Sequence, residues 1–181
     1  MVTKKLNSKV AIITGASSGL GLTISDFLYE KGLKIAVCSR NISKLKKRYK
    51  DNKRVLVKKA DLTKMSEIKN FLSDVKKKFS TVDYLINNAG IAIPSRIEKL
   101  KIKDLENIFK VNLFAPSMLL KNVSKIMRKK NFGRIINISS GGAINCAESY
   151  FAYSASKAAL NTLTKTAAKE LENYNIFVNS M

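Results

Sequence analysis

Short apolar runs alternate with longer helical segments from one end of this chain to the other. Six runs rich in valine, isoleucine and leucine predict strands at residues 10–14, 34–39, 54–58, 83–87, 134–139 and 176–179. The segments between them have helical periodicity, at residues 19–31, 43–50, 64–79, 104–130 and 151–173. Such alternation is typical of parallel strands joined by right-handed helical crossovers. It predicts an α/β fold in which residues 1–181 form one domain, a doubly wound, Rossmann-like parallel sheet with helices on both faces.

Length and cysteine content narrow the class of protein. A chain of 181 residues is long enough to bury a substantial core without disulfides or metal ions. Cys38 and Cys146 are far apart and histidine is absent, so we expect no metal site and a reducing, cytoplasmic environment. No apolar run reaches the ~18 residues of a membrane span, and the N-terminal residues lack the apolar region of a signal peptide. We therefore expect no membrane partner.

The chain is strongly basic, with 34 Lys and Arg against 13 Asp and Glu and a net charge of +21. Such a charge suggests nucleic acid or an anionic membrane surface as a partner. The basic residues, however, are spread over the whole chain, lie on the solvated faces of predicted helices and are not interleaved with aromatic residues. This distribution favours a protein that does not bind nucleic acid. The alternative, a nucleic-acid-binding protein, predicts salt-sensitive binding to a duplex.

A glycine-rich turn follows the first predicted strand and opens the first helix, with Gly15, Gly19 and Gly21 in the sequence TGASSGLG. Glycines there let the backbone turn tightly and approach a pyrophosphate at the N-terminus of the helix. The spacing is GxxxGxG and differs from the usual GxGxxG. Tight packing alone also explains such a turn, but its position on the first strand–helix unit favours a dinucleotide site.

The ends of the second and third strands bear on the choice of dinucleotide. The second strand ends in Ser39 and Arg40, without the acid that usually holds the ribose 2′-hydroxyl of NAD, whereas arginine accommodates a 2′-phosphate. Lys44, one helical turn later, adds a second positive charge. The alternative interpretation is that Arg40 is an ordinary surface residue of a basic protein and does not contact a cofactor. We therefore predict NADP(H) as the cofactor, with Asp61, followed by Leu62, accepting a hydrogen bond from the adenine amino group.

Candidate catalytic residues follow the fourth and fifth strands. Residues 87–90, Asn-Asn-Ala-Gly, are small enough for a ribose and nicotinamide to lie against the sheet. Ser140 ends the fifth strand, Tyr153 follows thirteen residues later and Lys157 four residues after that, so the last two share a helix face. A positive charge ~5 Å from a tyrosinate stabilises it by about 3 kcal/mol at an effective dielectric constant of ~20. The spacing alone is a weak signal, because Tyr and Lys are both common on helices, but a serine at a strand end just upstream strengthens it. Together they favour Tyr153 as a general acid and base whose pKa is lowered by Lys157 and an oxidised nicotinamide ring.

Asn112 lies on the apolar stripe of the long predicted helix, where a polar side chain needs partners. Pro116, four residues later, has no N–H to donate to the Asn112 carbonyl. We expect a kink there and a carbonyl free to hold a water molecule, with a simple helix break as the alternative.

These motifs occur together in the order and approximate spacing of a known family. They are TGASSGLG, Asp61, NNAG, Asn112, Ser140 and Tyr153-Ser-Ala-Ser-Lys157. The chain resembles the short-chain dehydrogenase/reductase family, in its single-domain form, over residues 8–181. The resemblance implies reversible hydride transfer between NADP(H) and a small carbonyl compound or secondary alcohol. It implies that Tyr153 is the general acid and base and that Ser140 positions the substrate carbonyl. It further implies that Lys157 binds the nicotinamide ribose and that Asn112 holds a water molecule for proton relay. The expected cofactor-binding residues are Gly15, Ser17, Ser18, Gly19, Leu20, Gly21, Ser39, Arg40, Asp61, Leu62, Asn88, Ala89, Gly90, Tyr153 and Lys157.

The chain departs from the family pattern at its end. Members of the family continue beyond the sixth strand into a Pro-Gly turn, a substrate-covering loop and a last strand. We therefore expect a C-terminally incomplete domain whose substrate cannot be identified, and a homo-oligomer for a full-length form. The alternative function is a non-catalytic, NADP(H)-binding remnant of such an enzyme.

Overall fold

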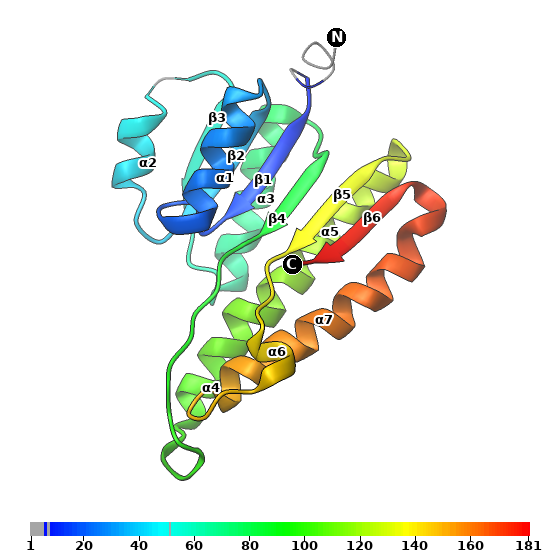
Figure 1. The fold of residues 1–181 in the computed structure, drawn as a ribbon. Coiled ribbons are helices and arrows are strands. Elements are labelled where there is room, and N and C mark those ends of the chain that lie inside the picture. Colours follow the sequence, from blue (N-terminus) through cyan, green and yellow to red (C-terminus); the bar gives the residue numbers. More distant parts are fainter. Residues whose placement is uncertain (1–5, 7, 51) are drawn as a thin grey trace.

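The computed structural model describes residues 6, 8–50 and 52–181. Their strands form one six-stranded parallel sheet in the order β3-β2-β1-β4-β5-β6 (Figure 1). The strands are β1 (Val10–Thr14), β2 (Lys34–Ser39), β3 (Val55–Lys59), β4 (Tyr84–Asn87), β5 (Gly133–Asn137) and β6 (Ile176–Ser180). The α-helices are α1 (Gly19–Glu30), α2 (Ser43–Arg48), α3 (Met65–Phe79), α4 (Ile102–Phe109), α5 (Ala115–Lys129), α6 (Gly142–Asn145) and α7 (Phe151–Leu171). The predicted doubly wound, Rossmann-like fold is confirmed.

The central strands are buried on both faces, which explains why they appear in the sequence as continuous apolar runs. Successive side chains of a strand point to opposite faces. Ile12 accordingly packs in one core cluster with Phe71 of α3 and Leu119 of α5. Ile13, its neighbour, packs in a second cluster with Leu45 of α2. The two faces of β1 therefore pack against two separate hydrophobic cores.

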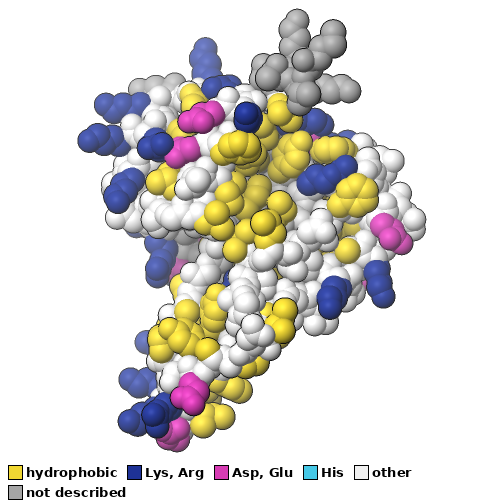
Figure 2. Space-filling view, in the orientation of Figure 1, with side chains coloured by type: hydrophobic (Ala, Val, Ile, Leu, Met, Phe, Trp, Pro, Cys, Tyr) yellow, Lys and Arg dark blue, Asp and Glu magenta, His cyan; other side chains and the backbone are white. Residues whose placement is uncertain are grey.

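The two faces of the sheet are not covered to the same extent. Helices α3, α5 and α7 lie behind the sheet in Figure 1, whereas α1 and α2 lie in front of β1, β2 and β3. On β6 the side chain of Phe177 is 49% exposed. Figure 2 shows hydrophobic side chains at the surface on this side of the molecule. The described helices on one face thus extend behind the whole sheet, whereas those on the other face lie mainly over β1, β2 and β3.

The prediction of one helix over residues 104–130 was wrong. Helix α4 is followed by a π-helical segment, η3 (Lys110–Phe114), and then by α5. The N–H of Ala115 donates to the carbonyl of Lys110, five residues earlier, and Pro116, which has no N–H, follows at once. The predicted irregularity is therefore a π-helical bulge, a feature that often occurs at functional sites.

Smaller differences concern the ends of elements and short helices. The ends of the predicted strands and of the other long helices lie within two residues of the observed ones, the usual uncertainty of such boundaries. The helix α6 and two 3-10 helices, η2 (Ile97–Lys99) and η4 (Glu172–Tyr174), were not predicted because a single turn shows no periodicity. Among the described residues, no helix is both long enough and apolar enough to cross a membrane.

The strand order reverses between β1 and β4, which are paired in parallel with Ile13 opposite Ile86. The chain leaves β1 towards one face of the sheet and β4 towards the other. In open α/β sheets the crevice at such a switch point, beyond the carboxyl ends of the strands, is the usual ligand site.

Candidate active site

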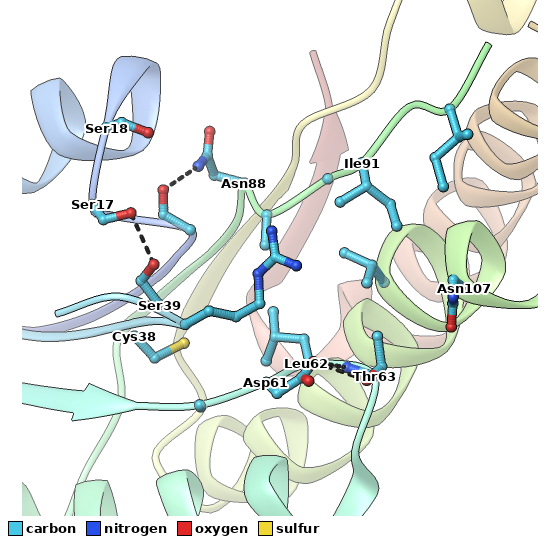
Figure 3. A pocket seen from close by; sticks show the side chains of 17 residues that line it. Ser17, Ser18, Cys38, Ser39, Asp61, Leu62, Thr63, Asn88, Ile91 and Asn107 are labelled. Atoms are coloured by element: carbon cyan, nitrogen blue, oxygen red, sulfur yellow. Dashed lines mark hydrogen bonds between the residues drawn. The ribbon is translucent and has the colours of Figure 1, made fainter. Parts of the chain in front are cut away.

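A cavity of about 590 Å³ opens at the carboxyl ends of the strands around this switch point. Figure 3 shows the side chains that line it. Ten of the predicted cofactor-binding residues are among them: Gly15, Ser17, Ser18, Ser39, Arg40, Asp61, Leu62, Asn88, Ala89 and Gly90. The cavity is also lined by seven residues that were not predicted: Cys38, Ala60, Thr63, Ile91, Ile93, Asn107 and Val111. The other five predicted cofactor-binding residues, Gly19, Leu20, Gly21, Tyr153 and Lys157, do not line it.

The turn between β1 and α1 packs directly against the loop after β4. Gly15 has a φ of +65°, and a Cβ atom there would lie 2.8 Å from the Cα of Ala89. A Cβ atom on Gly21 would collide with the Nδ2 atom of Asn88. That Nδ2 atom donates hydrogen bonds to the carbonyls of Thr14 (3.0 Å) and Gly15 (3.2 Å). Only glycine allows this close approach, which fixes the shape of the cavity wall.

The ends of β2 and β3 supply the polar groups at one end of the cavity. The hydroxyl of Ser39 donates to the Oγ atom of Ser17 at 2.8 Å, and Figure 3 shows the two side chains directed toward each other. Arg40 and Asp61 are the charged residues of the lining. Burial opposes ionisation of Asp61, but hydrogen bonds from Thr63 outweigh it and hold the pKa of this carboxyl below its usual value. The positive charge of Arg40 lowers that pKa further.

Asn112, in the π-helical segment, is fully buried. Its Oδ1 atom accepts from the N–H of Ile91 at 2.9 Å, and its Nδ2 atom donates to the Ile91 carbonyl at 2.9 Å. Nδ2 also donates to the hydroxyl of Ser156 at 3.0 Å, and that hydroxyl donates to the carbonyl of Tyr153 at 2.7 Å. The side chain of Asn112 therefore ties the loop after β4 to helix α7. The water-holding role predicted for Asn112 rests on its main-chain carbonyl.

Lys157 is a buried cation beside the cavity. Its side chain lies on α7, the residue is 3% exposed, and its Nζ atom donates to the carbonyl of Ile138 at 2.7 Å. Burial without a counter-charge lowers the pKa of this ammonium from 10.5 to about 8. The position that a Cβ atom on Gly90 would occupy is 3.5 Å from both Lys157 Nζ and Asn112 Oδ1. Gly90, which lines the cavity, thus leaves a gap beside the ammonium.

The structure also brings Ser140 and Tyr153 together. A Cβ atom on Gly142 would lie 3.5 Å from Ser140 Oγ and 3.7 Å from Tyr153 Cε1. The Oγ atom of Ser140 accepts from the N–H of Gly142 at 3.1 Å. Lys157 Nζ lies 5.8 Å from the centre of the Tyr153 ring. The serine, from the loop after β5, and the tyrosine and the lysine, from α7, therefore converge next to the cavity.

Comparison with known proteins shows the family of the chain. Residues 9–181 match the family model described as short chain dehydrogenase. The chain belongs to the short-chain dehydrogenase family. It is 34% identical to an uncharacterized oxidoreductase of Staphylococcus saprophyticus, over 98% of this chain and 78% of that protein. It is 33% identical to the D-beta-hydroxybutyrate dehydrogenase of Rhizobium meliloti, over 96% of this chain and 70% of the relative.

A solved structure shows the same fold. The crystal structure of an NAD⁺-bound xylitol dehydrogenase superimposes with a TM-score of 0.88 and 31% sequence identity, over 97% of this chain and 70% of that one. The chain is thus an oxidoreductase of the short-chain dehydrogenase family, whose members bind a nicotinamide cofactor.

Several site residues escaped the sequence analysis. The Thr14 hydroxyl accepts from the N–H groups of Asn88 (3.1 Å) and Ala89 (3.0 Å), and Ser156 connects Asn112 to Tyr153. Two features of the sequence could have identified these residues. Thr14 ends an apolar strand, and Ser156 lies on the buried face of a helix. In the part of the chain that the structure describes, no cluster of three or more His, Cys, Asp or Glu residues is arranged to hold a metal ion.

Proposed function

We propose that this protein transfers a hydride reversibly between NADP(H) and a carbonyl compound or secondary alcohol. The observation that carries the proposal is the convergence of Ser140, Tyr153 and Lys157 beside a cavity at the switch point of the sheet. The names of two relatives support the reaction type, since D-beta-hydroxybutyrate and xylitol are both hydroxy compounds.

Features of the cavity support a phosphorylated dinucleotide as its ligand. Its wall is free of side chains at Gly15 and Gly90, and among the described residues its lining carries two charged ones, Arg40 and Asp61. Arg40, with the hydroxyls of Ser17 and Ser39, offers donors to a 2′-phosphate at the end of β2, where NAD-binding proteins usually carry an acid. This supports NADP(H), although the xylitol dehydrogenase is NAD⁺-bound and another relative, from Listeria innocua, is named an NAD-dependent glycerol dehydrogenase.

Each catalytic residue has a task that its surroundings permit. When bound, the cofactor supplies or accepts the hydride. The hydroxyl of Ser140 donates a hydrogen bond to the substrate oxygen, and Tyr153 gives that oxygen a proton in reduction and removes it in oxidation. The ammonium of Lys157 stabilises the tyrosinate that remains. In reduction one proton is therefore taken up through Tyr153 for each alcohol formed, and in oxidation one proton is released through it.

Fluorescence titration with NADPH and NADH tests the cofactor assignment. NADPH should bind more tightly, and Arg40→Asp should weaken its binding by about tenfold or more, because a charge-assisted contact is lost. Lys47→Asp makes the same change of charge on α2, at an exposed position outside the cavity lining, and should leave the preference unchanged. Equal affinity of the unmodified protein for both cofactors would refute the NADP(H) assignment.

Turnover tests the proposed chemistry separately from binding. The protein should oxidise NADPH in the presence of a simple ketone. If NADPH binds and no ketone or alcohol is converted, the protein is a non-catalytic NADP(H)-binding member of the family.

A further inference from the structure

Ser154, in the first turns of α7, carries a buried hydroxyl. The residue is 6% exposed, and its main-chain N–H donates to the carbonyl of Tyr150 at 2.8 Å. Among the described residues, however, its hydroxyl has no hydrogen-bond partner. Leaving a buried hydroxyl unpaired is unfavourable. We therefore expect this hydroxyl to gain a partner when the protein is at work.

The hydroxyl also departs from the behaviour of other buried hydroxyls on the helices of this chain. Those of Ser25 and Thr164 each donate at 2.7 Å to the carbonyl four residues earlier. The carbonyl in the corresponding position for Ser154 belongs to Tyr150, and the Ser154 hydroxyl does not donate to it. Its side chain is therefore directed away from the usual local acceptor.

The hydroxyl of Ser140 borders the same small space as that of Ser154. A Cβ atom on Gly142 would lie 3.5 Å from both Ser140 Oγ and Ser154 Oγ, and 3.7 Å from Tyr153 Cε1. Gly142 begins α6, which lies beside the first turns of α7 in Figure 1. Because glycine has no side chain, the space between the two hydroxyls stays open next to the ring of Tyr153.

The partner of the Ser154 hydroxyl has to come from residues that already surround it. The Ser154 oxygen is inaccessible to solvent, so a substrate in the cavity does not touch it. Ser140 Oγ accepts from the N–H of Gly142 at 3.1 Å. A hydroxyl oxygen has two acceptor sites and one proton to donate. Ser140 can therefore accept a second hydrogen bond, from Ser154, and still donate its own proton to a substrate.

We propose that Ser154 is a positioning residue for Ser140. With substrate bound, its hydroxyl donates to Ser140 Oγ and so directs the Ser140 proton at the substrate oxygen. Hydrogen bonds of an active site are often long in the free protein and tighten in the complex. A hydroxyl that accepts a hydrogen bond is also a stronger donor. This inference rests on the proposed function, and it adds to the site a residue that acts through Ser140.

The variant Ser154→Ala removes the hydroxyl and keeps a small side chain. With NADPH and a simple ketone, kcat/KM for the ketone should fall about fivefold, the loss expected for one hydrogen bond. The affinity for NADPH should not change. The midpoint of urea denaturation should stay the same or rise, because an unpaired buried hydroxyl is removed. An unchanged kcat/KM, or a lower midpoint of the kind that a merely structural role predicts, would overturn the inference.

Ser124→Ala is the matched control. Ser124 is also a buried serine of a helix, on α5 and outside the cavity lining. Its replacement should leave kcat/KM for the ketone unchanged.

A double-mutant cycle with Ser140→Ala tests whether Ser154 acts through Ser140. Ser154→Ala should lower kcat/KM in the unmodified protein and have almost no effect when residue 140 is already alanine, because the effects of coupled residues do not add. Losses that add in the double variant would mean that Ser154 acts independently of Ser140, and would overturn the inference.

Binding of cyclohexanone, ¹³C-labelled at its carbonyl, to the NADP⁺-loaded protein separates this inference from the proposed function. A hydrogen bond to a carbonyl oxygen moves the resonance of its carbon downfield. The resonance of the bound ketone should lie further downfield in the unmodified protein than in Ser154→Ala, and should be the same in Ser140→Ala with or without Ser154→Ala. If these shifts are seen and no ketone is reduced, the positioning role stands and the proposed hydride transfer fails. If Ser154→Ala leaves the resonance unchanged, or if the ketone does not bind, the inference is overturned.

Discussion

Replacing Lys157 by methionine should make the protein more stable and at the same time remove its function. The ammonium is buried without a counter-charge, and its pKa falls from 10.5 to about 8. At 1.36 kcal/mol for each tenfold change in proton affinity, this difference corresponds to about 3 kcal/mol of destabilisation when the lysine is charged. Methionine keeps the unbranched aliphatic chain and removes the charge. It also removes the hydrogen bond to the Ile138 carbonyl, worth about 1 kcal/mol, so we expect a net gain of about 2 kcal/mol in the free energy of unfolding.

The gain in the free energy of unfolding should become smaller as the pH rises. Below pH about 8 the lysine is charged in both the folded and the unfolded chain, so the full cost of burying it is present. Between pH about 8 and 10.5 the folded chain has lost a proton that the unfolded chain still holds, and the stability of the unmodified protein rises with pH relative to the variant. The advantage of Lys157→Met should therefore be largest near pH 7 and shrink as the pH approaches 10.

Urea denaturation of both proteins, without cofactor, measures this difference at pH 7 and at several higher values. Fluorescence titration of the same two proteins in the absence of urea should show that the variant binds NADPH more weakly. A turnover assay should show that the variant has lost activity. A variant that is less stable than the unmodified protein at pH 7, or a stability difference that does not change with pH, would refute the assignment of Lys157 as a buried, uncompensated cation. Lys165→Met, at an exposed position on the same helix, serves as the control and should change stability by less than about 0.5 kcal/mol.

Three further predictions follow from the contacts of the site. Tyr153→Phe should lower turnover by several orders of magnitude and leave the affinity for NADPH nearly unchanged, since only the acidic hydroxyl is removed; a variant that keeps most of its activity contradicts the role of the tyrosine. Asn112→Ala should lower the free energy of unfolding by about 2 kcal/mol in urea denaturation, because the half-buried main-chain N–H and C=O of Ile91 lose their partner. Gly15→Ala should cost about 2 to 4 kcal/mol and abolish NADPH binding, because its φ is +65° and the new Cβ atom would lie 2.8 Å from backbone. Gly141→Ala, with a φ of −56° and open space around the new atom, should be tolerated.

The strands and most helices could be predicted because their patterns are local. Continuous apolar runs mark strands that are buried on both faces, and Val10–Thr14 and Lys34–Ser39 were predicted to the residue. Ser140, Tyr153 and Lys157 could also be proposed as catalytic residues from the sequence. Their residue types, the helical spacing of the last two and the end of the strand before Ser140 are all local features.

Predictions from the sequence were wrong where local patterns conflict with tertiary contacts. Residues 104–130 keep one helical periodicity, so they predict one helix, but the structure inserts a π-helical segment before Pro116. The role of the Asn112 side chain was missed for a related reason. Its partners are Ile91, on a loop 21 residues earlier, and Ser156, on a helix 44 residues later.

The sequence by itself therefore determined the doubly wound sheet, the glycine turn and the identity of the candidate catalytic residues. Only the tertiary structure decided that the Asn112 side chain fastens the loop after β4 to α7, and that Lys157 is buried against the Ile138 carbonyl. The physical reason is that periodicity and turn chemistry act between neighbours in the chain. The desolvation of a charge and the pairing of a buried amide depend on which distant segments the fold packs around them.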